Sequence, residues 1–196
     1  MNLLKAYREL EQHLCRRDQW PEFIRGSKLY AASRYKGEVK ELIVRCKKSH
    51  FNALPHLERV WIDRIIDHWI PFFKEHKIHD IVPVPSNPWR VLIQSSLSDY
   101  MAERIARALC VPVNRRLLQR RFFANGQVVK SQKLLDRSTR MSNCLGFKLR
   151  RESPKNHLVV DDLLVTGQSL GQAIALLKTH RHRVPMAFVL ARAQLL

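Results

Sequence analysis

Two adjacent carboxylates, Asp161 and Asp162, interrupt an apolar run and are followed by a Thr-Gly-Gln-Ser turn at residues 166–169. Carboxylate oxygens accept hydrogen bonds from sugar hydroxyls, directly or through a hydrated divalent cation. The turn offers backbone N–H groups, hydroxyls and the positive end of a helix dipole, which together suit a phosphate. Gly167 lets the backbone approach such a ligand closely. The pattern therefore predicts a site for a phosphorylated sugar.

The same residues also have a purely structural interpretation. Ser169 and Gln172 have the spacing of a capping box, in which two side chains satisfy the first N–H groups of a helix. Asp161 and Asp162 could likewise do no more than end a strand. Like charges side by side after a buried strand repel each other, however, and structure alone does not require them there. The capping interpretation of Ser169 stays open, whereas the acid pair favours a functional site.

The elements that must position this site follow from the spacing of apolar residues. Residues 158–160 are apolar and partly β-branched, which predicts a short buried strand. Residues 170–180 carry apolar side chains at helical spacing. The acid pair is predicted to lie in the loop between them, at the carboxyl end of the strand. Ligands bind at that end in open α/β sheets.

The rest of the chain continues the alternation of strands and helices, which predicts an α/β fold with a mostly parallel sheet and helices on both faces. The predicted strands are residues 28–34, 81–84, 111–118, 147–149 and 185–190. The predicted helices are residues 39–48, 54–76, with Pro71 as a kink or an end, and 99–109, capped by Ser98 or Asp99.

The length and composition indicate one main domain. A chain of 196 residues with 45% hydrophobic content can bury a core. Residues 1–18 lack a signal-peptide core and show the spacing of an amphipathic helix. We expect a helical segment over residues 1–27 and the main domain over residues 28–196. No apolar run approaches the roughly 18 residues of a membrane span. The four cysteines are isolated from one another in the sequence. These features predict a cytoplasmic protein.

The net charge is the second prominent feature of the chain. Thirty-five Lys and Arg residues against 17 Asp and Glu residues give +18, a balance that favours polyanions. Phe122 and Phe123 adjoin one basic pair, and such a neighbourhood suits single-stranded nucleic acid. The alternative is that each basic cluster is only a solvated face. The candidate nucleic-acid-binding residues are Arg115, Arg116, Arg120, Arg121, Arg137 and Arg140.

The run around the acid pair resembles the signature of the type I phosphoribosyltransferases, which bind 5-phosphoribosyl 1-pyrophosphate. That signature has two acids, apolar residues and then Thr-Thr-Gly-x-Thr/Ser; here Val165 stands in place of the first Thr. The resemblance implies that Asp161 and Asp162 hold the ribose hydroxyls, and that Mg²⁺ binds through the ligand and water rather than directly to the protein. It also implies a group of 5-phosphate-binding residues, namely Val165, Thr166, Gly167, Gln168 and Ser169.

Further segments are similar to the competence protein ComF family. They are the Tyr-Lys-Gly turn and basic helix within residues 30–47, the Pro-Val-Pro strand end at residues 83–85, and the closing Ala-Arg at residues 191–192. Gln132, Leu135, Arg140 and Asn143 follow the family's spacing as well. The resemblance implies a phosphoribosyltransferase-like domain with a small hood, linked to DNA uptake in natural transformation and to other DNA-uptake proteins.

The chain departs from the family pattern after the Pro-Val-Pro strand. The family's Arg-Gly-Phe-Asn-Gln loop, on the pyrophosphate side of the ligand, is replaced in register by Gln-Ser-Ser-Leu-Ser at residues 94–98. Ser86, Asn87 and Arg90 are the candidates left on that side, and an arginine among residues 115–121 is an alternative substitute. Two functions stay open: a phosphoribosyl-ligand-binding protein, with or without pentosyl transfer, and a non-catalytic factor that binds single-stranded nucleic acid.

Overall fold

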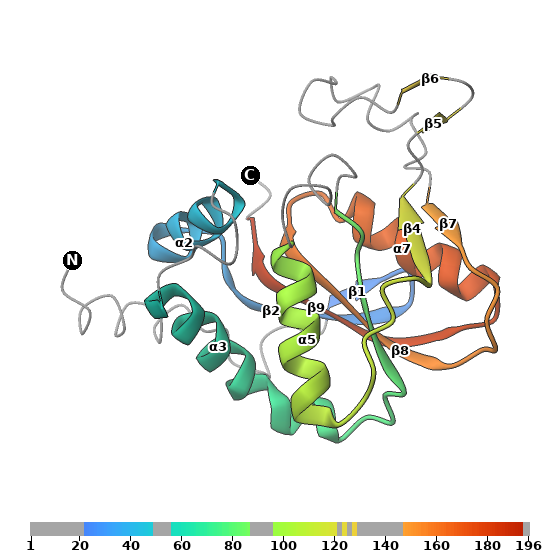
Figure 1. Cartoon of the computed structure of the whole chain (residues 1–196), viewed down its shortest axis with the longest axis horizontal. Helices are drawn as coiled ribbons and strands as arrows, with labels where there is room; N and C mark the ends of the chain where they lie inside the picture. The colour runs from blue at the N-terminus through green and yellow to red at the C-terminus, as the bar shows by residue number, and fades with distance from the viewer. Residues whose placement is uncertain are drawn as a thin grey trace.

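The computed structural model describes residues 22–48, 56–86, 96–120, 123–124, 127–128 and 147–193. Its centre is a five-stranded sheet in the order β1-β2-β9-β8-β3 (Figure 1). These strands are β1 (Glu22–Ile24), β2 (Ser27–Arg34), β3 (Asp80–Pro83), β8 (Asn156–Leu164) and β9 (Arg183–Arg192). All neighbouring pairs are parallel except β1 with β2. The predicted α/β class with a mostly parallel sheet is confirmed.

Helices cover both faces of this sheet, as predicted. They are α2 (Gly37–Lys48), α3 (His56–Lys74), α5 (Leu97–Leu109) and α7 (Gln168–Thr179). The first three pack with Tyr30, Leu158 and Phe188 in one hydrophobic cluster. Helix α7 packs with Val159 and Val189 in the cluster on the other face. Because side chains of a strand alternate between its faces, one short apolar strand supplies both clusters.

Helix α3 is anchored to the sheet by aromatic side chains. Trp69 and Phe73 are fully buried, and their ring centroids lie 5.7 Å and 5.1 Å from that of Phe188. Of the two alternatives predicted for Pro71, a kink or an end, the end is wrong, because the helix continues to Lys74. Burial of Phe73 beyond the proline explains this, since the packing of a large aromatic ring outweighs the lost backbone hydrogen bond.

Two predicted boundaries need correction. Helix α5 begins at Leu97, and Ser96 is its N-cap because its hydroxyl oxygen accepts a hydrogen bond from the Asp99 N–H at 3.1 Å. Ser98, one of the two predicted caps, is instead buried inside the helix. The strand predicted at residues 111–118 is reduced to one bridge between Val113 and Ile81.

The strands outside the main sheet form two small pairs. Strand β4 (Leu118–Arg120) pairs with β7 (Phe147–Leu149), whose bounds match the prediction, and β5 (Phe123–Ala124) pairs with β6 (Gln127–Val128). Most of the expected hood, over residues 120–142, lies outside the described residues.

A chain of buried polar side chains joins three strands at their amino ends. Asp80 on β3 accepts a hydrogen bond from Nδ1 of His157 on β8. Nε2 of His157 lies 2.8 Å from Nδ1 of His182, which directly precedes β9. All three side chains are buried. Asn114 donates a further hydrogen bond to Asp80 at 3.3 Å. Mutual hydrogen bonding offsets the cost of placing these groups in the core.

The predicted organisation of the chain ends is only partly described. Residues 1–21 of the expected helical segment lie outside the described residues, while β1 falls within that segment and pairs with β2. The boundary at residue 28 therefore stays a prediction. In the described part of the chain, no helix combines the length and apolarity that crossing a membrane requires. The cytoplasmic location also stays a prediction.

Candidate functional site

The acid pair lies within strand β8 rather than in the loop after it. β8 runs from Asn156 through both aspartates to Leu164. The predicted strand end before Asp161 is therefore wrong. Strand β9 gives the reason, because Asp161 is in register with Val189 and the Ala193 N–H donates to the carbonyl oxygen of Leu164 at 2.8 Å. A continuous partner strand keeps the backbone extended past the apolar residues.

Strand β3, on the other side of β8, ends earlier. Pro83 is in register with Val160, and the Val84 N–H donates to the Val160 carbonyl oxygen at 2.8 Å. Val84 leads directly to Ser86, one of the predicted pyrophosphate-side residues. Ser86 therefore follows the carboxyl end of β3, beside the acid pair. The other two predicted residues of that group, Asn87 and Arg90, lie outside the described residues.

Asp162 forms an ion pair with a lysine from a distant part of the chain. Nζ of Lys47, near the end of α2, lies 3.0 Å from Oδ1 of Asp162. The two side chains are 28% and 17% exposed, so the pair is partly shielded from water but reachable. Lys47 was not among the predicted site residues, because the pattern of residues 39–48 indicates only a basic helix. No spacing along the chain signals a contact across 115 residues.

Asp161 has a different environment from Asp162. Asp161 Oδ1 accepts a hydrogen bond from the Asp162 N–H at 2.9 Å, and the charge of Lys47 acts on both carboxylates. Burial, followed by the charge of Asp162, raises the pKa of Asp161 to about 7, while the Asp162 N–H, Lys47 and Arg120 act to lower it. Burial therefore favours the protonated form of Asp161, whereas the cations beside it favour the carboxylate.

Arg120 lies on the Asp161 side of the strand. Burial lowers the pKa of its guanidinium, and the charge of Asp161 partly offsets that effect. Its guanidinium carbon lies 5.6 Å from the centroid of the Phe147 ring. Within the described part of the chain, its buried Nε has no hydrogen-bond partner. The structure thus places Arg120, predicted to bind nucleic acid, near the acid pair, with a donor group that lacks an acceptor.

The predicted phosphate loop leads from β8 into α7. Val165 and Thr166 are exposed, and Gly167, Gln168 and Ser169 are partly exposed. Gly167 is the N-cap of α7, so the predicted capping box of Ser169 with Gln172 is wrong because Ser169 already lies in the first turn. The Gln168 N–H donates to the Thr166 hydroxyl oxygen at 3.4 Å. The N-cap residue Gly167 has no side chain with which to accept from the other N–H groups of the first turn, and such N–H groups can donate to an anion.

Replacing Gly167 by Ala is expected to destabilise the fold by about 1–2 kcal/mol. Gly167 has φ +71°, and an added Cβ would lie 3.2 Å from Cδ1 of Ile24. Gly171→Ala is the matched control, because its Cβ would meet Ile24 at an ordinary 3.4 Å within the helix. That control should leave stability unchanged or raise it by up to about 1 kcal/mol. Urea unfolding of both variants is the measurement, and equal effects would contradict the strained turn.

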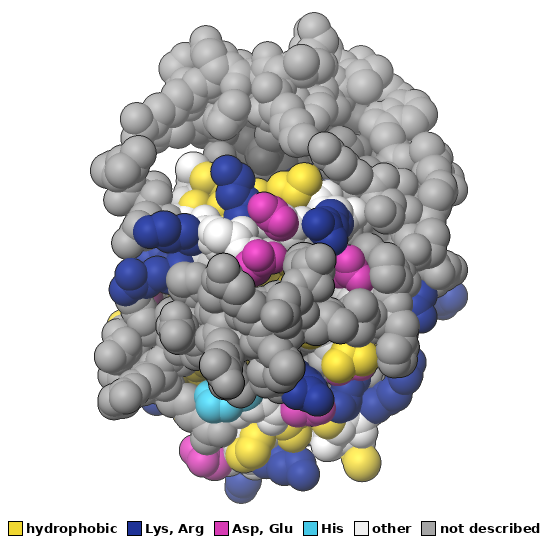
Figure 2. All heavy atoms as spheres, turned by 90° about the vertical axis from the view of Figure 1, so that its left-hand side faces the viewer, with side chains coloured by type: hydrophobic (Ala, Val, Ile, Leu, Met, Phe, Trp, Pro, Cys, Tyr) yellow, Lys and Arg dark blue, Asp and Glu magenta, His cyan; other side chains and the backbone are white. Residues whose placement is uncertain are grey.

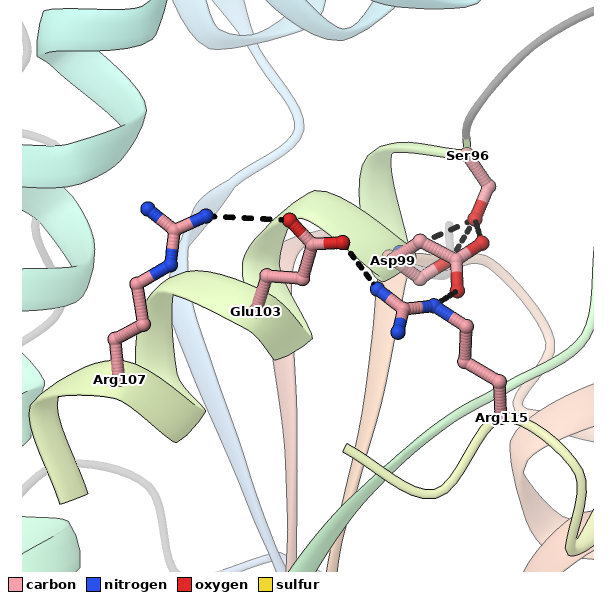
Figure 3. Close-up of polar contacts among 6 residues, drawn as sticks. Ser96, Asp99, Glu103, Arg107 and Arg115 are labelled. Carbon is pink, nitrogen blue, oxygen red and sulfur yellow. Dashed lines mark hydrogen bonds and ion pairs between the residues drawn. The ribbon is translucent and has the colours of Figure 1, made fainter. Parts of the chain in front are cut away.

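Arg115, another predicted nucleic-acid-binding residue, is held against helix α5. Its Nε lies 3.3 Å from Oδ1 of Asp99, and its guanidinium also pairs with Glu103 (Figure 3). Arg116, its neighbour, is exposed. Asp99 and Glu103 therefore offset the charge of Arg115. The remaining three candidates, Arg121, Arg137 and Arg140, lie outside the described residues.

The donor groups at this site do not form a direct metal centre. Among residues 22–48, 56–86, 96–120 and 147–193, no group of three or more His, Cys, Asp or Glu side chains is arranged to hold a metal ion. Asp162 already has Lys47 as its cation. This chemistry fits Mg²⁺ only as an ion carried by the phosphates of a ligand and by water.

The comparisons with known proteins find distant likeness among solved structures. No family model matches the chain, and no curated protein matches it. Among solved structures, UMP synthase of Leishmania donovani is similar with a TM-score of 0.41 and 15% sequence identity. The match covers 81% of this chain and 32% of that one, so the chain spans about a third of the length of its neighbour.

Proposed function

We propose that this protein binds a ligand of the 5-phosphoribosyl 1-pyrophosphate type at the carboxyl end of β8. One observation carries the proposal: the strand that holds Asp161 and Asp162 leads directly into the first turn of α7, whose N-cap is a glycine. Carboxylates for sugar hydroxyls and N–H groups for a phosphate are thereby joined in one short segment. The sequence resemblance to the type I phosphoribosyltransferases and the ComF family supports the same ligand.

Each part of the site has a role in this proposal. Asp161 and Asp162 accept hydrogen bonds from the ribose hydroxyls. The segment of residues 165–169 binds the 5-phosphate through its backbone N–H groups and hydroxyls. Ser86 is assigned to the pyrophosphate side because it follows the end of β3, and Asn87 and Arg90 are assigned there from the sequence alone. Arg120 donates to the ligand, which would supply the acceptor that its buried Nε lacks.

The same arrangement suits transfer of the pentosyl group. A nucleophilic atom of an acceptor bonds to the anomeric carbon as the bond from that carbon to pyrophosphate breaks and pyrophosphate leaves. Positive charge develops on the ribose in this step, and the two carboxylates beside it stabilise that charge. Where the ligand carries Mg²⁺ on its pyrophosphate, that ion would neutralise the charge of the leaving group. The remote 5-phosphate contacts hold the sugar in place, so that binding energy there is used to position the reacting carbon.

The described basic residues favour the ligand site over the nucleic-acid-binding function. Arg115 is paired with acids, and Arg120 is beside the acid pair. Near the centre of the face drawn in Figure 2, acidic side chains lie between lysine and arginine side chains. The net charge of +18 still favours polyanions, and phosphate-rich ligands are among them. A role in DNA uptake rests on the ComF resemblance alone, and we do not make it the proposed function.

Calorimetric titration with 5-phosphoribosyl 1-pyrophosphate, with and without Mg²⁺, tests the proposal. We expect the wild type to bind and the variant Asp161→Asn/Asp162→Asn to lose at least about 100-fold in affinity, because charge-assisted hydrogen bonds to both hydroxyls are lost. Asp63→Asn/Asp67→Asn, a double change of the same kind on helix α3, is the control and should bind as the wild type does. Absence of binding by a folded wild type would contradict the proposed function.

A further inference from the structure

Lys47 has no role in the ligand-binding site described above, although its ammonium group contacts Asp162. Its helix α2 packs on the sheet, and the preceding Cys46 is buried in the core cluster. Burial, then the charges of Glu58 and Asp162, raise the pKa of that thiol to about 12. The end of α2 is therefore fixed close to the acid pair, and the Lys47 ammonium is delivered to Asp162 by a packed helix rather than by a free loop.

We propose that Lys47 binds the pyrophosphate group of the ligand and thereby selects pyrophosphorylated ribose over ribose 5-phosphate. The inference rests on the proposed function of the acid pair. An ammonium group has three N–H donors, and Asp162 Oδ1 is the acceptor of one of them. The remaining donors can reach a phosphate oxygen while the pair with Asp162 persists.

The geometry favours this role over simple neutralisation of Asp162. A cation that only neutralises a buried carboxylate would be best placed deep in the core. The Lys47 side chain is instead 28% exposed, near the carboxyl end of β8. A ribose whose hydroxyls bind Asp161 and Asp162 presents its anomeric substituent close to those hydroxyls. An ammonium 3.0 Å from a hydroxyl-binding oxygen therefore lies within reach of that substituent.

The test is a pair of titrations with the full chain. Lys47→Gln removes the positive charge but keeps an N–H donor for Asp162, and Lys40→Gln changes an exposed lysine of the same helix as a matched control. We expect Lys47→Gln to weaken binding of 5-phosphoribosyl 1-pyrophosphate by about 10- to 100-fold, and binding of ribose 5-phosphate by no more than about 2-fold. Lys40→Gln should change neither, and Lys47→Arg, which keeps the charge, should restore most of the lost affinity.

The outcomes separate this inference from the proposed function. Equal losses for both ligands in Lys47→Gln, or no loss for either, would overturn the role of Lys47 while leaving the acid-pair site intact. A wild type that binds neither ligand would overturn the proposed function and the inference with it. If Lys47→Gln does not fold, Lys47→Arg becomes the deciding variant. The inference would be overturned if Lys47→Arg binds pyrophosphorylated ribose less than about 3-fold more tightly than ribose 5-phosphate.

Discussion

Asp161→Asn should raise the free energy of unfolding above that of the wild type at pH 8. This gain should be about 2 kcal/mol larger at pH 8 than at pH 5. The pKa of Asp161 is raised from 3.8 to about 7, chiefly by burial. A raised pKa means that the folded protein holds a proton that the unfolded chain releases. Its contribution to stability is complete below about pH 4 and is lost as the pH rises through about 7. Asparagine has no charge to bury and so avoids that loss.

The matched variant for this prediction is Asp162→Asn. Asp162 is stabilised by its ion pair with Lys47, so its replacement should lower stability or leave it unchanged at pH 8. Urea unfolding of the wild type and both variants at pH 5 and pH 8 measures the differences. A stability difference between Asp161→Asn and the wild type that does not vary with pH would contradict the account. A gain in stability at the expense of binding is the pattern expected of a functional residue.

Asp80→Ala should lower the free energy of unfolding by about 3–5 kcal/mol, the range seen when one partner of a buried polar pair is removed. Nδ1 of His157 and the amide of Asn114 would both lose the acceptor that they share. The effect spreads to His182, since its hydrogen bond with His157 depends on the orientation that Asp80 imposes on that ring. Denaturant unfolding near pH 8 measures the loss.

Asp67→Ala is the surface counterpart of this change. Asp67 pairs with Arg104 on neighbouring helices, and its side chain is half exposed. An exposed pair contributes about 1 kcal/mol or less, so this control should stay close to the wild type. Similar losses in the two variants would show that the chain of Asp80, His157 and His182 contributes no more than a surface salt bridge.

The pH dependence of this buried chain can be predicted as well. Burial, followed by the charge of His157, lowers the pKa of His182. The unfolded chain therefore binds a proton that the folded protein resists, so stability is complete above about pH 6.5 and falls as the pH drops below that value. Asp161 and the histidine chain thus act in opposite directions, and their effects on the free energy of unfolding should partly cancel between about pH 4 and pH 6.5.

Local patterns in the sequence were sufficient for the class of fold and for the elements that flank the acid pair. The apolar residues 158–160 predicted the buried strand, and the helical spacing after them predicted α7 within two residues of its start. A parallel sheet then required the acid pair to lie at a carboxyl edge. These features depend on residues close in the sequence, and for that reason they were predictable.

The features that were missed depend on tertiary contacts. Strand β8 extends through Asp161 and Asp162 because β9 pairs alongside, which no propensity of an aspartate would suggest. Lys47 and Arg120 reach the acid pair from elements far away in the sequence. Gly167 became the cap of α7 in place of Ser169 because a positive φ at that turn suits glycine.

The most direct test of the central claim is an NMR titration, in which the backbone amide resonances of the isotopically labelled protein are followed as ligand is added. Adding 5-phosphoribosyl 1-pyrophosphate with Mg²⁺ should shift the amides of residues 161–171, and those of Asp80 and His157 at the opposite end of the sheet should stay in place. Asp161→Asn/Asp162→Asn should abolish the shifts. Shifts centred on another surface, or none at saturating ligand, would contradict the assignment of this strand end as the binding site.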